Sequence, residues 1–160
     1  ACGLSGCDMG VVVSHKRSNS GMDWGFVGDI DTVNEKMLAL LLENGIMPVI
    51  SPITCSPAGQ LLNTNADSVA SAVAIALSRR YETELVYCFD KPGVLKDAED
   101  NSSVIPQMDR ETYDVLRKEG YIHSGMLPKL ENAFKTLESG VKKVRLTSPE
   151  NPDGGTVIGF

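Results

Sequence analysis

Short apolar runs alternate along this chain with longer segments in which apolar residues recur every three or four positions. The segment Asp31–Asn44 has this helical spacing, so it is predicted as a helix with Asp31 as its N-cap and Gly45 just beyond its C-terminal end. The apolar run Met47–Ile50 follows at once and is predicted as a strand. A helix followed directly by a strand is a typical step of an α/β fold.

The same alternation continues to the end of the chain. It predicts further elements, namely the helices Ala66–Arg80, Asp109–Glu119 and Leu127–Ser139, the last two closed by Gly120 and Gly140, and the strands Glu84–Phe89, Lys142–Leu146 and Thr156–Ile158. Apolar strands that alternate with helices predict a mostly parallel sheet covered on both faces. The polar segment Lys96–Ser103 is predicted as a solvated loop.

The composition is that of an ordinary globular protein. The 160 residues, 42% of them hydrophobic and 22% charged, suit a single domain that spans residues 1–160. The net charge of -6 argues against binding to nucleic acid or to an anionic membrane, because recognition of a phosphate backbone needs a basic face. The sequence has no run of about 18 apolar residues and no charged leader before an apolar run, so it predicts neither a membrane span nor a signal peptide.

The four cysteines, at positions 2, 7, 55 and 88, form no C-x-x-C pair and have no histidine at the spacing of a metal ligand. This pattern argues against a zinc site, and no metal site is predicted. Cys88 lies in the apolar run Leu85–Phe89, where a buried, reduced thiol is the expected state. Reduced thiols fit a cytoplasmic protein.

The segment Gly59–Asp67 is the most informative part of the chain, because Asn63, Asn65 and Asp67 fall within five residues at a junction from loop to helix. A side-chain amide offers a donor and an acceptor together, and a carboxylate holds cationic groups in position. The same residue types also start helices. From this segment alone, a binding site and a helix cap are both open.

Three other segments extend the pattern, and in chain order the four are Gly25–Ile30, Gly59–Asp67, Tyr87–Leu95 and Ser124–Ala133. Together they resemble the acetylglutamate kinase branch of the amino-acid kinase family, and the resemblance runs over almost the whole chain. The run Asn63–Asp67, with the pattern N-x-N-A-D, discriminates this branch from the aspartate, glutamate, uridylate and carbamate kinases of the same family. The resemblance implies an α/β fold, a three-layer α/β/α sandwich with a mostly parallel sheet.

The chain also departs from the family pattern. Members of the family begin with a strand that carries a catalytic lysine and a Gly-Gly turn, followed by a His-Gly-Gly-Gly loop and a substrate-binding arginine, and none of these is found here. The resemblance therefore implies the C-terminal, ATP-binding part of a longer kinase, incomplete at its N-terminus. Such a part is expected to be inactive by itself, because half of the groups that neutralise phosphate would be missing.

The resemblance gives catalytic roles to Lys129 and Asp67. Lys129 follows Pro128, so it belongs to the first turn of a predicted helix, where free backbone N–H groups already attract phosphate. It matches the second catalytic lysine of the family, and Asp67 matches the carboxylate that orients both catalytic lysines. Without the resemblance, an exposed structural lysine and a helix-start carboxylate are the default interpretations.

The resemblance also implies contacts with substrate and nucleotide. Asn63 matches the residue that helps bind the α-carboxylate of the acylated amino acid, and Asn65 lies in the same pocket. The residues that match the nucleotide-binding positions are Asp90, Gly93, Val94, Leu95, Gly125, Met126 and Lys129. Mg²⁺ would be held mainly by the phosphates of ATP, so no protein metal site is expected.

The implied activity is that of an N-acyl-L-glutamate 5-kinase of arginine biosynthesis. This enzyme transfers the γ-phosphoryl group of ATP to the side-chain carboxylate of N-acetyl-L-glutamate or N-succinyl-L-glutamate and forms an acyl phosphate. A cytoplasmic homodimer is the expected state of the complete enzyme. Two alternatives stay open: a nucleotide-binding fragment without catalysis, and another kinase of the same family, against which the N-x-N-A-D run counts.

Overall fold

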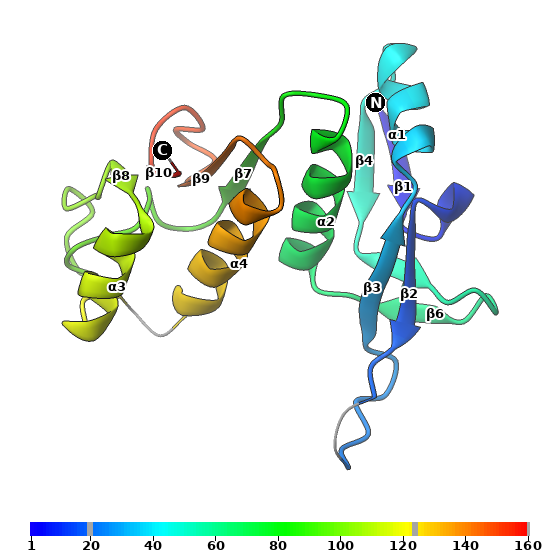
Figure 1. Cartoon of the computed structure of the whole chain (residues 1–160), viewed down its shortest axis with the longest axis horizontal. Helices are drawn as coiled ribbons and strands as arrows, with labels where there is room; N and C mark the ends of the chain where they lie inside the picture. The colour runs from blue at the N-terminus through cyan, green and yellow to red at the C-terminus, as the bar shows by residue number, and fades with distance from the viewer. Residues whose placement is uncertain (19–20, 123–124, 160) are drawn as a thin grey trace. The chain divides into compact units, whose positions relative to one another are not determined.

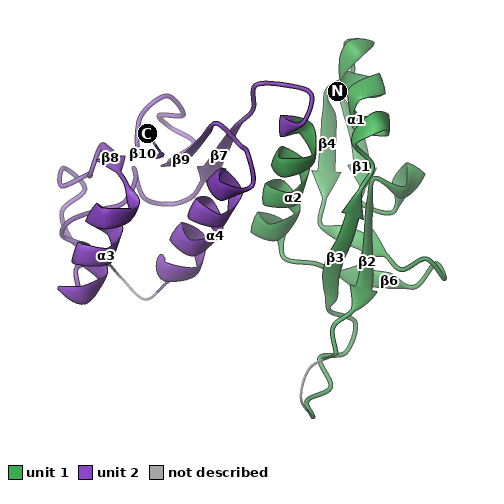
Figure 2. Ribbon diagram, viewed as in Figure 1, with its two compact units in different colours: residues 1–77 green, residues 78–160 purple. Residues whose placement is uncertain are grey.

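In the computed structural model, residues 1–18, 21–122 and 125–159 are described. They form two compact units, one in residues 1–77 and the other in residues 78–160 (Figure 2). Each unit has its own strands, helices and buried residues. The prediction of one domain over residues 1–160 stays a prediction, because two compact units can belong to one domain or to two.

The first unit has six strands, one 3-10 helix and two α-helices among its described residues (Figure 1). In chain order they are β1 (Cys2–Ser5), the 3-10 helix η1 (Asp8–Gly10), β2 (Val12–Lys16), β3 (Gly28–Val33), α1 (Glu35–Glu43), β4 (Pro48–Ser51), β5 (Ile53–Cys55), β6 (Leu61–Asn63) and α2 (Ala66–Ser78). β1 pairs in parallel with β4, and the other strands form a sheet in the order β3-β2-β5-β6. Within that sheet the β2–β5 pair is parallel, whereas the β2–β3 and β5–β6 pairs are antiparallel.

The core of the first unit is a cluster of apolar side chains from its strands and from both of its α-helices. Val11 and Val12 are fully buried and belong to one cluster with Leu38 of α1 and Val69 of α2. Partly buried residues complete the cluster, namely Leu4, Ile30, Val33, Met37, Ile50, Val73 and Leu77. Because burial of apolar surface is the main favourable contribution to folding, this cluster is what holds α1 and α2 against the strands.

Gly28, at the start of β3, lies where no side chain would fit. A Cβ atom at this position would be 2.6 Å from Thr64 Oγ1 and 2.9 Å from Leu62 Cβ. The hydroxyl groups of Thr54 and Thr64 are in turn hydrogen-bonded to each other at 2.8 Å in the interior. The close approach explains the last glycine of the Gly25-Phe26-Val27-Gly28 run, and it brings the start of β3 against the end of β6.

The second unit has four strands and two α-helices among its described residues (Figure 1). In chain order they are β7 (Glu84–Cys88), β8 (Gln107–Met108), α3 (Arg110–Lys118), α4 (Leu127–Glu138), β9 (Lys143–Thr147) and β10 (Thr156–Ile158). The strands form one sheet in the order β7-β9-β10-β8. The β7–β9 and β10–β8 pairs are parallel, and the β10–β9 pair is antiparallel.

Buried and exposed residues alternate along β7, so only one face of this strand is covered. Leu85 and Tyr87 are buried, whereas Cys88 is exposed with the other residues of its face. The prediction that Cys88 is a buried thiol is therefore wrong. An apolar run does not distinguish a strand covered on both faces from one covered on a single face, and the two-residue period of the strand decides which side chains are buried.

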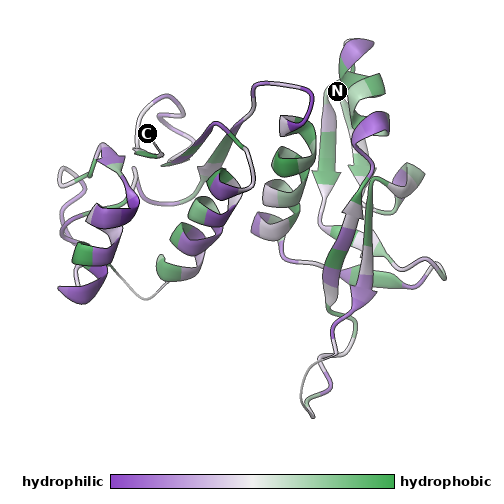
Figure 3. Ribbon diagram, in the orientation of Figure 1, coloured by the Kyte–Doolittle hydropathy of each residue, from purple (hydrophilic) through white to green (hydrophobic). Residues whose placement is uncertain are grey.

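The helices α3 and α4 each carry polar and apolar residues along their length, as Figure 3 shows. This is typical of helices with one buried face. Tyr113 of α3 is fully buried, and its ring packs against that of Phe134 of α4 with the ring centroids 5.2 Å apart. The two helices thus share part of the core of the second unit.

The predicted helices and strands after residue 46 are confirmed to within one or two residues at each end, as α2, α3, α4, β4, β7, β9 and β10. Gly45, Gly120 and Gly140 have φ angles of +71°, +79° and +105°, the left-handed conformation expected just beyond a helix end. The short strands β1, β2, β3, β5, β6 and β8 are additions to the sequence prediction.

The prediction for Asp31 is wrong. α1 begins at Glu35, and its N-cap is Asn34, whose side chain accepts a hydrogen bond from the backbone N–H of Met37 at 3.2 Å. Asp31 lies within β3, because antiparallel pairing with β2 keeps the chain extended as far as Val33. Tertiary pairing has overridden a local capping signal.

The α/β class is confirmed. Of the seven strand pairs that the described residues form, four are parallel and three are antiparallel. In the described ranges, no helix has the length and apolar character that crossing a membrane would require. The same ranges contain no group of three or more His, Cys, Asp or Glu side chains that could hold a metal ion.

Candidate functional site

Two parts of the chain carry the predicted site residues, and the first is the connection between β6 and α2. Asn63 is the last residue of β6, and its backbone N–H donates to the carbonyl of Phe26 at 2.8 Å. The next residue, Thr64, is buried and hydrogen-bonded to Thr54, whereas Asn63 and Asn65 are exposed. The alternation therefore anchors this segment through Thr64 and leaves both asparagines accessible to a ligand.

Asn65 caps α2. Its Oδ1 accepts hydrogen bonds from the backbone N–H of Ser68 at 3.0 Å and from Ser68 Oγ at 3.2 Å. This is the arrangement in which a side-chain oxygen satisfies a free N–H group of the first helical turn. The capping alternative is thus confirmed for Asn65. Contact with a substrate would have to use the Nδ2 group of the same amide, and that contact stays a prediction.

Asp67 is the second residue of α2 and is half-buried. A carboxylate in the first turn of a helix is stabilised by the partial positive charge at the helix N-terminus. Because Asn65 provides the N-cap, α2 does not need the Asp67 carboxylate as its capping group. Its predicted role as the carboxylate that orients a lysine stays a prediction.

The second part is a cavity of about 430 Å³ in the second unit. It is lined by residues that follow β7, by residues that follow α3 and by residues at the start of α4. The described lining residues are Phe89, Asp90, Lys91, Gly93, Val94, Leu95, Ala98, Glu99, Tyr121, Ile122, Gly125, Met126 and Lys129. All seven positions predicted to contact nucleotide are in this set, and the volume is in the range of small-molecule sites, about 300–1,000 Å³. Ser124, the first residue of the predicted Ser124–Ala133 motif, lies outside the described residues.

The cavity wall formed by the residues that follow β7 is anchored to β10. Val94 is buried, and its backbone N–H donates to Thr156 Oγ1 at 2.8 Å. Gly93 lies so close that a Cβ atom there would be 2.9 Å from the same oxygen and 2.9 Å from Val104 Cγ1. Thr156 is fully buried. A glycine and a buried hydroxyl group thus fix the backbone of this wall.

Another part of the lining is the start of α4, where Lys129 is the third helical residue, after Leu127 and Pro128. The N-cap residue is Met126, which makes no side-chain capping hydrogen bond within the described part of the chain. The N-terminus of a helix presents backbone N–H groups and a partial positive charge, both of which favour an anion. With the ammonium group of Lys129 beside it, this part of the cavity is suited to phosphate.

Several lining residues were not predicted from the sequence. Ala98 and Glu99 come from the segment predicted as a solvated loop, and Lys91 Nζ donates to the Ala98 carbonyl at 3.3 Å, which ties this loop to the cavity. Tyr121 and Ile122 follow the end of α3. Gly120 is the sequence feature that could have indicated Tyr121 and Ile122, because a left-handed glycine after a helix reverses the direction of the chain.

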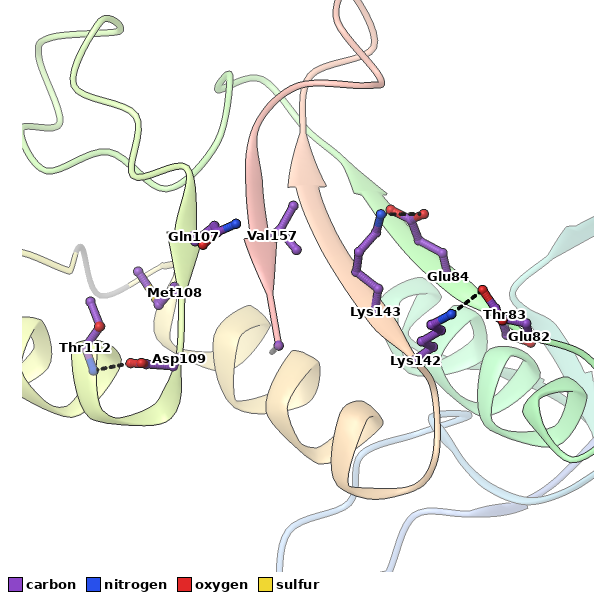
Figure 4. Close-up of a pocket in the computed structure, with 11 residues that line it drawn as sticks. Glu82, Thr83, Glu84, Gln107, Met108, Asp109, Thr112, Lys142, Lys143 and Val157 are labelled. Carbon is purple, nitrogen blue, oxygen red and sulfur yellow. Dashed lines mark hydrogen bonds and ion pairs between the residues drawn. The ribbon is translucent and has the colours of Figure 1, made fainter.

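A second cavity, of about 880 Å³, lies in the same unit and is shown in Figure 4. Glu84 and Lys143 at its wall are the first residues of β7 and β9, so this cavity lies at the amino ends of two parallel strands. The first cavity, in contrast, follows the carboxyl end of β7 at Phe89. Since open α/β sheets bind ligands at the carboxyl ends of their strands, the first cavity is the stronger candidate.

The charged groups of the second cavity are engaged in structural interactions. Lys143 pairs with Glu84 at 3.1 Å, one of the interactions drawn in Figure 4. Burial raises the pKa of Glu84, but hydrogen bonds from Lys143 and Arg145 outweigh burial and leave this pKa below its ordinary value. Asp109 caps α3 by accepting a hydrogen bond from the backbone N–H of Thr112 at 2.7 Å, which lowers the pKa of Asp109. These groups therefore stabilise the fold around the cavity.

Comparison with known proteins agrees with the geometry. Residues 1–148 match the model of the amino acid kinase family. The chain is 46% identical over 147 residues to an acetylglutamate kinase of Parabacteroides distasonis, an alignment that covers 92% of this chain and 58% of that protein. It is also 46% identical over 160 residues to an acetylglutamate kinase of Bacteroides fragilis, with 99% of this chain and 61% of that protein covered.

A solved structure gives the same answer for the fold. The crystal structure of smu.665 from Streptococcus mutans UA159 superposes with a TM-score of 0.75 at 30% sequence identity, covering 93% of this chain and 56% of that chain. The chain thus spans 58% and 61% of the length of these two curated relatives.

Proposed function

Because this chain belongs to the amino acid kinase family, we propose that it forms the nucleotide-binding part of an N-acyl-L-glutamate 5-kinase. The complete enzyme transfers the γ-phosphoryl group of ATP to the side-chain carboxylate of an N-acylated glutamate. The product is an acyl phosphate, and the reaction is a step of arginine biosynthesis. Relatives that carry the name acetylglutamate kinase support this substrate class.

The observation that supports the proposal most strongly is the cavity beside the carboxyl end of β7. All of the residues expected to contact the nucleotide line it, although they come from two segments that are far apart in the sequence. Two separate segments that match nucleotide-binding positions of the family thus meet at one cavity. We therefore infer that this cavity binds ATP.

The chemistry of the lining suits the parts of a nucleotide. Phosphoryl transfer requires positioned phosphates and groups that neutralise the charge of the transition state. Lys129 and the first turn of α4 supply positive charge and N–H donors for the phosphates. Apolar side chains of Val94, Leu95 and Met126 suit the base and ribose.

The acceptor substrate involves the connection between β6 and α2. Asn63 is exposed at the end of β6, so its amide is available to bind the α-carboxylate of the acylated glutamate. Asn65 offers its Nδ2 group, because its Oδ1 is used in capping α2. Asp67 is the carboxylate that orients the catalytic lysines of the enzyme by charge-assisted hydrogen bonds.

Mg²⁺ accompanies ATP in this proposal and is held mainly by the nucleotide phosphates. It supplies neutralising charge to the phosphates when it is bound. The complete enzyme is proposed to be a cytoplasmic homodimer.

The test is an assay of the complete kinase with ATP, Mg²⁺ and either N-acetyl-L-glutamate or N-succinyl-L-glutamate. ADP release and trapping of the acyl phosphate with hydroxylamine report the reaction, and the better substrate identifies the acyl group. Lys129→Ala should lower turnover roughly 10²-fold or more, the effect of removing one preorganised stabiliser of transition-state charge. ATP binding without ADP release would instead favour a non-catalytic nucleotide-binding protein, and phosphorylation of a different acceptor would favour another kinase of the family.

A further inference from the structure

Two of the four cysteines, Cys7 and Cys55, meet in the first unit although they are far apart in the sequence. The Cys7 thiol donates to the carbonyl of Ile53 at 3.6 Å, and Ile53 lies two positions before Cys55 in β5. The thiols of Cys7 and Cys55 also form a hydrogen bond with each other. Both cysteines are partly exposed, so a small molecule can reach this pair of thiols.

The backbone before Cys7 packs directly against β5. Gly6 approaches this strand so closely that a Cβ atom there would be 3.0 Å from the Ile53 carbonyl oxygen and 3.0 Å from Thr54 Cγ2. The carbonyl of Gly6 accepts a hydrogen bond from the backbone N–H of Val12 at 2.7 Å. Cys7 is therefore held beside β5 by the fold, and its position does not depend on the thiol contact alone.

The turn that carries Cys7 is fixed by a carboxylate. Asp8 Oδ2 accepts hydrogen bonds from the backbone N–H of Ser5 at 2.6 Å and from the Ser5 hydroxyl group at 2.9 Å. Cys55 lies in β5, where it pairs with Val13 of β2. Because both thiols are held on ordered backbone, a bond between them profits from the high effective concentration of groups that are already in place.

The two thiols differ in their readiness to react. Burial raises the pKa of the Cys7 thiol, and its hydrogen bond with the Cys55 thiol raises this pKa further. The thiolate is the attacking form in thiol–disulfide exchange, so the Cys7 thiol, which keeps its proton, is the poorer first nucleophile. The first attack on an oxidant therefore falls to Cys55, and Cys7 reacts second.

We propose that Cys7 and Cys55 form a redox site that a small disulfide, such as oxidised glutathione, converts reversibly to an intramolecular disulfide. The Cys55 sulfur attacks one sulfur of oxidised glutathione, and the first reduced glutathione leaves with the proton of Cys55. The Cys7 sulfur then attacks the Cys55 sulfur of this mixed disulfide, and the second reduced glutathione leaves with the proton of Cys7. Each protein sulfur loses one electron, and each glutathione sulfur gains one.

Oxidation changes the first unit in two ways. The Cys7 thiol no longer donates to the Ile53 carbonyl, because its proton has left. The new bond closes a loop of residues 8–54, which restricts the unfolded chain. The proposal goes beyond the proposed function and does not depend on it, because it concerns only thiols of the first unit. Disulfides that form in a reducing compartment are usually transient and redox-sensing, so reversibility is part of the proposal.

The test uses the folded 160-residue chain, first reduced and then incubated with an excess of oxidised glutathione. Iodoacetamide blocks the remaining thiols, and intact mass together with peptide mapping without reduction locates each bond. We expect a Cys7–Cys55 link, seen as the loss of two hydrogen atoms, whereas Cys2 and Cys88 should each react singly with glutathione or iodoacetamide. Dithiothreitol should restore four free thiols.

Three single variants are the matched controls. Cys7→Ser removes the second thiol of the sequence of attacks, so Cys55 should keep a glutathione adduct without an intramolecular link. Cys2→Ser and Cys88→Ser remove thiols outside the pair and should form the Cys7–Cys55 link as the parent does. Thermal melting identifies any variant that fails to fold, and Cys55→Ser, which should also form no link, replaces Cys7→Ser if that variant is unfolded.

The same oxidation in concentrated urea separates the effect of the fold from that of the sequence. In the unfolded chain the shortest loop closes most readily, so a Cys2–Cys7 link should appear and the Cys7–Cys55 link should become a minor product. The proposal is overturned if the folded parent leaves Cys7 and Cys55 unlinked, as free thiols or as separate adducts. It is also overturned if Cys7 links to Cys2 in the folded chain, or if urea leaves the yield of the Cys7–Cys55 link unchanged.

Discussion

The hydrogen bond from the Val94 backbone N–H to Thr156 Oγ1 allows a sharp test of how the cavity wall is held. Thr156→Val is nearly isosteric and replaces the accepting hydroxyl group with a methyl group. Both residues are buried, at 2% and 0% exposure, so water cannot replace the lost partner. Leaving a buried donor unsatisfied costs about 1–3 kcal/mol. We expect a loss of this size in the free energy of unfolding, measured by urea titration.

Thr147→Val is the matched control. Thr147 is as buried as Thr156, but its Oγ1 donates to the carbonyl of Asn151, an exposed residue. Water can take the place of that donor, so the substitution should cost less than about 1 kcal/mol. The two variants have the same change in chemistry and differ only in the group left behind.

The reasoning is refuted if Thr156→Val and Thr147→Val lose the same stability, or if Thr156→Val loses none. Thr156→Ser adds a second check, because it keeps the acceptor and removes one methyl group. It should retain the affinity of the parent for ATP, whereas Thr156→Val should weaken ATP binding by loosening the backbone of Gly93 and Val94 at the cavity.

Three further outcomes are expected. In the complete kinase, Asp67→Asn should lower turnover and leave the melting temperature nearly unchanged, because Asn65 and not Asp67 caps α2. Turnover and melting temperature are measured on one preparation of the variant. Asn63→Ala should raise the Michaelis constant for the acylated glutamate roughly ten- to a hundredfold, which corresponds to the loss of one hydrogen bond to a charged group. The Michaelis constant for ATP should be unchanged in the same steady-state assays. Stability should fall in acid, because a hydrogen bond from Tyr113 at 2.8 Å holds the pKa of Glu131 below its ordinary value. This contribution is fully present above the unfolded pKa of about 4.3 and is lost as the pH falls through the lower folded pKa. Glu131→Gln should therefore flatten the acid limb of a stability–pH profile.

Each of these outcomes has a clear opposite. A destabilised Asp67→Asn with normal turnover would make Asp67 a structural residue of the first helical turn. Equal effects of Asn63→Ala on both substrates would mean that Asn63 supports the loop and contacts neither. An acid limb that is the same in Glu131→Gln as in the parent would assign the pH dependence to other carboxylates.

Elements with strong periodicity were predicted well from the sequence, and their ends were marked by local chemistry. α3 and α4 follow the helical spacing of their apolar residues, and the chain leaves each helix through a left-handed glycine. Such signals act over a few residues, so they are visible without knowledge of the fold. The strands β5 and β6 have three residues each, which is too short for an alternating pattern to be recognised, and β5 also pairs with the distant strand β2.

The candidate site shows the same division. The cavity residues of Asp90–Leu95 and Gly125–Lys129 were accessible through motifs. Thr156, in contrast, matters because of what it contacts in space. A hydroxyl group that reaches a backbone N–H 62 positions earlier leaves no trace in composition or spacing. Residues of this kind become visible only when the chain is folded.

The contact between Gly28 and Thr64 restricts how this part of the chain can be exchanged between proteins. The place where a Cβ atom of residue 28 would lie is occupied by the Thr64 hydroxyl group and by Leu62, so positions 28 and 64 share one volume. A larger residue at either position requires a smaller one at the other. Grafting the Asn63–Asp67 segment onto another protein of this fold would therefore require transplanting Gly28 with it, because the two segments form one interchangeable unit.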